Sequence, residues 1–274
     1  MSAYISFEWL KMSRRWMPRV IVLLMLGLVV LAFWGQGTRS ADQFNLMLPR
    51  GWLVALVFAS FFAPFFWPVL GGSWAGNEYG WGTVRMVLSH RPYRIQQALS
   101  ALAVLILGAG VALLTVFVTG TLGGLAVGEL THHTAFASGV MSGTFLATLV
   151  KGVLAAWYVA TFYLVLAYAA GTIFRSAAVG IGIGIGATLA QVVLRGIFFS
   201  LGGVWRNISE HFPIIYTNDF TTRVVSSSLQ PGSSMASVDP SAPSIVSSLI
   251  AVAIFIAVLL AATMVAVRAR DVTA

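Results

Sequence analysis

The sequence has no cysteine, which excludes disulfide bonds and metal sites built on thiolates. Charge is also scarce, because 9% of the 274 residues are charged, whereas an average soluble domain contains about 25%. Apolar residues make up 58% of the chain, more than so few charged residues could cover in water. The composition therefore indicates an integral membrane protein.

Several motifs that carry chemistry are missing as well. The chain has no P-loop, no nucleophile elbow and no pair of aspartate-rich motifs of the kind that membrane prenyltransferases use. If ATP drives this protein, a separate chain must hydrolyse it. A net charge of +8 would suggest nucleic acid as the partner of a soluble protein. In a membrane protein basic residues collect at the cytoplasmic edges of the bilayer, so we expect no nucleic-acid partner.

Six apolar stretches are long enough to cross a bilayer, which takes about 20 residues for roughly 30 Å of hydrocarbon. The first is short, and Met17 and Trp34 can extend it into the interfaces. Residues 4–18 mix aromatic and basic side chains, which is typical of an amphipathic helix lying in the interface. We predict an all-α, polytopic fold, a single transmembrane domain over residues 1–274, with a long external loop at 204–244 and spans at about 19–34, 51–70, 97–119, 144–171, 177–201 and 245–267.

The placement of lysine and arginine predicts the orientation. One side of the membrane carries ten of these residues: Lys11, Arg14, Arg15, Arg19, Arg85, Arg91, Arg94, Arg175, Arg268 and Arg270. The other side carries four: Arg39, Arg50, Arg206 and Arg223. Because basic residues favour the cytoplasmic side, we predict a multi-pass protein of the cell membrane with both termini in the cytoplasm.

Residues 77–92, NEYGWGTVRMVLSHRP, form a polar island between the second and third predicted spans. Asn77 can cap a helix that Pro92 helps to end, and Glu78 and Arg85, seven residues apart, share one face of it. Gly80 and its neighbour at position 82 would weaken an isolated helix by about 1 kcal/mol each. These glycines suit the close approach of a partner's backbone. An interfacial loop helix without a partner remains the alternative.

The run from Glu78 to Arg85, followed by Leu88, Arg91 and Pro92, resembles the first cytoplasmic loop of ABC transporter permeases of the type-2 class. The likeness extends to the basic N-terminal helix, the six spans and the long loop before the last span. It implies a cytoplasmic coupling helix between spans two and three that inserts into a separate ATPase subunit. The residues implied in that contact are Glu78, Gly80, Gly82, Thr83, Arg85 and Arg91.

The same resemblance implies the function and the partners. It predicts the permease subunit of an exporter of the drug- or antibiotic-efflux kind, without enzyme activity of its own. ATP and Mg²⁺ would bind to the ATPase subunit, and this chain would hold no cofactor. The expected partners are that ATPase, a second permease copy and membrane lipids. A membrane anchor that holds an ATPase without moving a solute would use the same loop and is the structural alternative.

A different alternative is an intramembrane metal-dependent enzyme built on Glu129, His132 and His133. Zinc proteases use H-E-x-x-H on a helix, which places both histidines on one face. Here the order is E-x-x-H-H, adjacent histidines point apart, and the surrounding sequence is rich in glycine and threonine. We therefore expect a solvated loop and no metal site.

Two further features lie within the fifth predicted span. Gly180 and Gly184 have the spacing that lets two helices approach closely, in a packing contact or a dimer contact. Gln191 and Arg195 are polar residues within or near apolar surroundings, where such residues are costly and often functional. We consider this second pair candidates for the lining of a polar pathway.

Overall fold

The computed structural model describes residues 2–37, 43–80, 94–131, 141–229 and 242–269. Within these residues the chain is all-α and contains no strand, which confirms the predicted fold class. Among the described residues, six helices are long and apolar enough to cross a membrane. They are α2 (Trp16–Gly37), α4 (Arg50–Gly80), α6 (Arg94–Thr131), α7 (Gly143–Phe174), α8 (Ala177–Leu201) and α12 (Ile245–Ala269).

Shorter helices precede and connect the long ones. A basic helix leads into α2, one helical turn precedes α4, and three short helices followed by a 3₁₀ turn lie between α8 and α12. These elements are α1 (Ser2–Arg14), α3 (Gln43–Leu46), α9 (Gly203–Ser209), α10 (Pro213–Thr217), α11 (Phe220–Val225) and the 3₁₀ turn Ser226–Ser228. The predicted external loop is therefore largely helical in its described first half.

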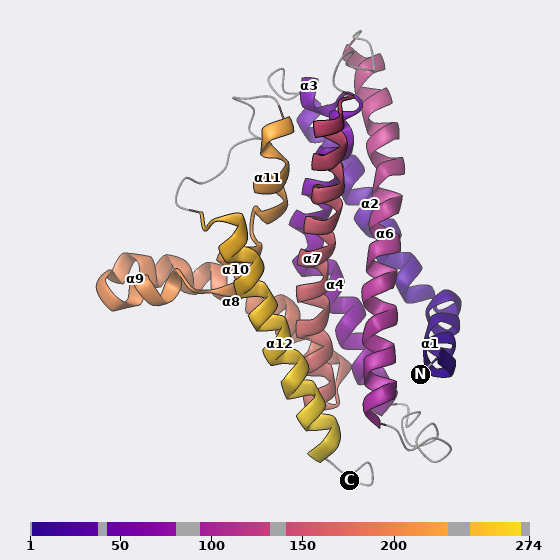
Figure 1. The fold of residues 1–274 in the computed structure, drawn as a ribbon, viewed down its shortest axis with the longest axis vertical. Coiled ribbons are helices and arrows are strands. Elements are labelled where there is room, and N and C mark those ends of the chain that lie inside the picture. The colour runs from indigo at the N-terminus through magenta and orange to yellow at the C-terminus, as the bar shows by residue number, and fades with distance from the viewer. Residues whose placement is uncertain (1, 38–42, 81–93, 132–140, 230–241, 270–274) are drawn as a thin grey trace.

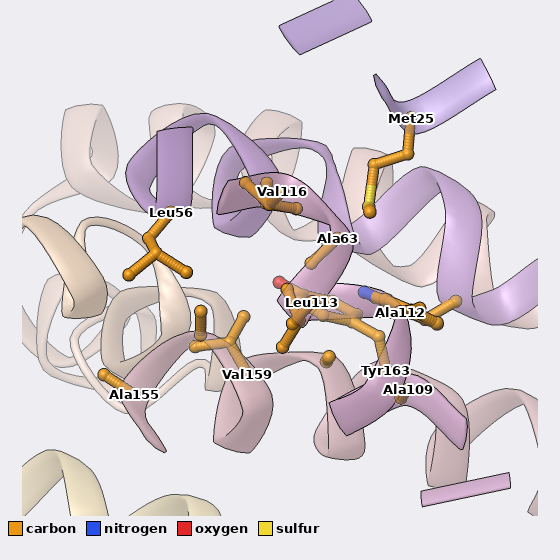
Figure 2. Close-up of a cluster of buried hydrophobic side chains, with 14 of the residues drawn as sticks. Met25, Leu56, Ala63, Ala109, Ala112, Leu113, Val116, Ala155, Val159 and Tyr163 are labelled. Carbon is orange, nitrogen blue, oxygen red and sulfur yellow. The ribbon is translucent and has the colours of Figure 1, made fainter. Parts of the chain in front are cut away.

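The central helix of the bundle is α4, which packs most extensively against α7 and also contacts α2, α6 and α8. In Figure 1 the long helices other than α8 stand side by side, α1 lies beside α6, and the end of α8 projects sideways from the bundle together with α9. Buried side chains fill the space between α2, α4, α6 and α7. Figure 2 shows Met25, Ala63, Leu113 and Val159 converging there, one from each of these four helices.

Two membrane helices extend well beyond the predicted spans, since α4 continues past Leu70 to Gly80 and α6 continues past Thr119 to Thr131. Their glycine-rich ends resemble loops in sequence, but they are closely packed helix. A Cβ added to Gly72 would come 2.5 Å from the backbone nitrogen of Ile181 in α8. Likewise, a Cβ on Gly123 would come 2.5 Å from the ring of Phe33 in α2. Glycine at these positions permits contacts that any side chain would block.

The break between the first two helices also differs from the prediction. We expected the interfacial helix to end at residue 18 and the first span to begin at 19, whereas α1 ends at Arg14 and α2 already begins at Trp16. Proline is tolerated in the first turn of a helix, because the amide groups there have no intrahelical acceptor. Pro18 therefore lies inside the first turn of α2. The bounds of α8, by contrast, match the predicted fifth span.

The glycine contacts of α8 generate a stability prediction. A Cβ on Gly184 would come 2.5 Å from the Cβ of Pro68, whereas a Cβ on Gly182 meets nothing within 4 Å. Gly184→Val should therefore destabilise the protein by about 1–3 kcal/mol through overpacking. Gly182→Val serves as the matched control on the same helix. Thermal unfolding in detergent, followed by tryptophan fluorescence, should show a lower midpoint for Gly184→Val alone; equal midpoints would contradict the packing described here.

Candidate functional site

In the described part of the chain, several charged side chains are buried together where α1 comes close to the end of α4. Glu8, Lys11 and Arg15 follow one another at helical spacing, so they project from one face of α1 and its junction with α2. On α4, Trp74 and Glu78 are one turn apart. We refer to these five residues as the α1–α4 charge cluster.

Lys11 is the centre of the α1–α4 charge cluster. Its ammonium lies 2.6 Å from Oε2 of Glu8 and also pairs with Oε1 of Glu78. The same oxygen of Glu8 accepts a hydrogen bond of 2.9 Å from the indole nitrogen of Trp74. The lysine therefore joins a carboxylate of α1 to a carboxylate of α4, 67 positions away along the chain.

The indole ring of Trp74 lies among the cations of this cluster. Nζ of Lys11 and the guanidinium carbon of Arg15 each lie 4.7 Å from its ring centroid. Cations are attracted to the faces of aromatic rings at such distances. Burial lowers the pKa of the Arg15 guanidinium, while the carboxylates of Glu78 and Glu8 act in the opposite direction. Two carboxylates and two cations thus share one compact site around the tryptophan.

Burial makes the pairing of these charges necessary. Glu8 has no exposed surface, and the side chains of Lys11 and Glu78 are 14% and 13% exposed. Removing one partner of a buried ion pair leaves a charge that neither water nor protein compensates. The α1–α4 charge cluster therefore holds α1 in a fixed position relative to the last turn of α4.

The structure describes part of the predicted coupling stretch. Asn77, which we expected to begin a separate helix, continues α4, and Glu78 follows it within the same helix. Glu78 is paired inside the chain with Lys11, so its contact with a partner subunit stays a prediction. Gly80 is the last residue of α4, and no described atom would meet a Cβ added there. Gly82, Thr83, Arg85 and Arg91 lie outside the described residues.

Gly180 and Gly184 lie in contacts within the chain. A Cβ on Gly180 would come 2.9 Å from the Cα atoms of both Gly72 and Gly171, so α4, α7 and α8 meet at three glycines. Gly184, one turn further along α8, faces Pro68 and an alanine of α7. Gly180 and Gly184 therefore permit close packing of α8 against α4 and α7. A dimer contact through these glycines, the alternative given above, stays a prediction.

Of the two polar residues on α8, Gln191 forms a hydrogen bond to another helix of the chain. Oε1 of Gln191 accepts a hydrogen bond of 3.0 Å from the backbone nitrogen of Ile214, in the first turn of α10. This bond satisfies one of the amide groups that a helix start leaves without an acceptor. Arg195 lies one turn further along α8 and is half-buried. Gln191 thus attaches α10 to α8, and a pathway role for either residue stays a prediction.

The structure describes one of the three residues of the predicted metal-enzyme alternative. Glu129 lies on α6, not in the loop that we expected, and its side chain is exposed. His132 and His133 lie outside the described residues. Across the described ranges no group of three or more histidine, aspartate or glutamate side chains could hold a metal ion.

A second polar region, which the sequence did not reveal, joins α11 to the bundle. Thr221 bonds to Ser60 of α4 at 2.8 Å, and Tyr163 of α7 bonds to Thr217 at 2.9 Å. These residues line a cavity of about 60 Å³. Arg223 donates to the carbonyl of Pro243 and to three other oxygens. Burial lowers the pKa of this guanidinium, and a nearby aspartate opposes the shift.

In comparisons with known proteins, no family model and no curated protein matches the sequence. Support for a function therefore comes from the motif that begins at Glu78 and from the contacts that surround it.

The pairing of Lys11 generates a second stability prediction. Lys11→Met removes the cation shared by Glu8 and Glu78, and breaking a buried pair in this way costs about 3 kcal/mol or more. Lys151→Met makes the same replacement at an exposed position of α7 and should leave stability unchanged. Chemical denaturation in detergent micelles measures both. If the two variants unfold at the same denaturant concentration, the α1–α4 charge cluster does not stabilise the fold.

Proposed function

We propose that this chain is the permease subunit of an ABC exporter of the type-2 class and works with a separate ATPase subunit. The observation that carries the proposal is the motif that starts at Glu78, in the last turn of the second membrane helix, and continues past the end of that helix. Under this proposal the chain lies in the cell membrane with both termini in the cytoplasm, and residues 77–92 contact the ATPase. ATP and Mg²⁺ bind to the ATPase subunit alone.

The α1–α4 charge cluster supports a mechanical role for this end of α4. Lys11 ties α1 to Glu78, and Glu78 is two residues before Gly80, where α4 ends. A displacement imposed on residues 77–92 would therefore act on α1 and α4 together. Neither helix could follow the movement alone without separating buried charges from their partners.

The glycine contacts support transmission from α4 into the bundle. Gly72 of α4 meets Gly171 of α7 and Gly180 of α8 with no side chain between the backbones. Closely packed interiors resist deformation and move as units. A shift of the end of α4 would thus displace α7 and α8 as well. This is the rigid-body movement that alternating access requires, with ATP binding to the partner favouring one of two states.

A second permease copy would complete the pathway. Of the six membrane helices, α8 and α12 are the least buried within the chain, and Gly182 of α8 faces open space. These apolar faces are available to lipid or to another copy of the chain. A pathway between two permease copies would open as their helices tilt.

Purification from the native membrane tests the proposal. A chain with a P-loop should co-purify with the tagged protein, and the complex should hydrolyse ATP in the presence of Mg²⁺. Arg85→Ala should reduce the amount of this ATPase chain that is recovered, because it removes a cation from the proposed contact. Arg268→Ala removes the same charge at the far end of α12 and should leave the recovery unchanged.

Two results would contradict the proposal. The first is the absence of any P-loop chain from the purified material after mild solubilisation. The second is full recovery of the ATPase chain with a variant that combines Glu78→Ala and Arg85→Ala.

A further inference from the structure

A groove between α1, α2 and α6 is separate from the α1–α4 charge cluster. Its volume is about 550 Å³, within the roughly 300–1,000 Å³ range of sites that hold small molecules. The floor is apolar and formed by buried residues that include Ile21, Trp67 and Leu70. At its rim lie the exposed side chains of Ser13 and Arg19. The groove thus joins a long apolar floor to a basic, polar rim.

The arginine at this rim, Arg19, has no acidic partner in the described part of the chain. Lys11, which does not line the groove, is the residue that pairs with the two nearby carboxylates. Arg19 donates a hydrogen bond of 2.5 Å to the backbone oxygen of Ser13, which holds its guanidinium beside α1. A cation fixed at the rim of an apolar groove matches an anion that carries a hydrocarbon chain.

A second observation comes from Trp67, on the floor of the groove. Its side chain is 1% exposed, and its indole nitrogen has no hydrogen-bond acceptor among the described residues. Buried tryptophan N–H groups usually have an acceptor, so the wall of the groove holds a buried donor that is left unsatisfied. A plain hydrocarbon chain has no acceptor, whereas the ester carbonyl of a phospholipid is one.

The alignment of α2 with α4 gives the difference in depth between Arg19 and the indole of Trp67. Oγ of Ser73 lies 3.1 Å from Sδ of Met17, so these residues are level in the two helices. Trp67 lies six residues before Ser73 on α4, and Arg19 lies two residues after Met17 on α2, which at 1.5 Å per residue gives roughly 9 Å and 3 Å in the same direction because the two helices run in opposite directions. The indole is therefore about 6 Å deeper than the arginine. A phosphate at Arg19 would place the lipid esters between them and the acyl chain along the floor.

We propose that this groove binds one anionic phospholipid, with its phosphate at Arg19 and an acyl chain over Trp67. Glycine at position 108 of α6 shapes one wall, because a Cβ there would come 2.6 Å from the sulfur of Met12. The bound lipid would fill the space between α1 and α2. This site does not depend on the proposed transport function.

Lipid retention tests this site directly. The full chain is placed in nanodiscs of equal phosphatidylglycerol and phosphatidylcholine, released, and examined by native mass spectrometry. The lipid retained by the unaltered protein should be richer in phosphatidylglycerol than the bilayer. Arg19→Gln should reduce retained phosphatidylglycerol about fivefold, the size expected for one cation beside an anionic lipid surface. Arg268→Gln, the same change at the end of α12, should have no effect.

A second pair of variants tests the groove itself. Val111 lines the groove and is 54% exposed, so Val111→Phe should fill it and reduce retention of both lipids. Val118→Phe makes the same change two turns along α6, outside the lining, and should leave retention unchanged. Equal retention of the two lipids by the unaltered protein would overturn the proposal. A Val111→Phe variant that changes the oligomeric state but leaves the amount of retained lipid unchanged would also overturn it, because the groove would then be an interface between copies of the chain.

Discussion

The burial of Lys11 between two carboxylates is the constraint on which the described arrangement of α1 and α4 depends. Glu8 is fully buried, and a buried carboxylate without a cation would be strongly destabilising. Because Lys11 also pairs with Glu78, satisfying Glu8 fixes the end of α4 at the same time. The indole of Trp74 closes the arrangement through its hydrogen bond to Glu8. The junction of α1 with α4 is therefore specified by charge in a protein whose other contacts are mostly apolar.

Close backbone contacts connect the same end of α4 to α7 and α8. From Glu78, α4 leads back to Gly72, which meets α7 and α8 at Gly171 and Gly180. One end of α4 thus combines an electrostatic contact to α1 with glycine contacts to two membrane helices. Under the proposed function, this combination would carry a displacement at the end of α4 to α1, α7 and α8. It also explains why glycine-rich sequence near residue 72 is compatible with uninterrupted helix.

The long apolar runs made the fold class and the six membrane helices predictable, and serine at position 176, which caps α8, marks its start. The extended ends of α4 and α6 were missed because Gly72 and Gly123 resemble loop residues until their packing partners are known. The α1–α4 charge cluster joins residues 67 positions apart, which no local pattern reveals. Glu8 was nevertheless a signal, as the one acidic residue among the first 41, at helical spacing from Lys11.

The most direct test of this account is the distance between α1 and α4 in a bilayer. The chain has no cysteine, so spin labels attach only where Leu10→Cys and Phe61→Cys introduce one on each helix, at exposed positions. Pulsed electron paramagnetic resonance in nanodiscs should give one narrow distance distribution. Adding Lys11→Met should broaden or lengthen that distribution, because the ion pairs that tie α1 to α4 are lost. An unchanged distribution would contradict the claim that the buried lysine holds these helices together.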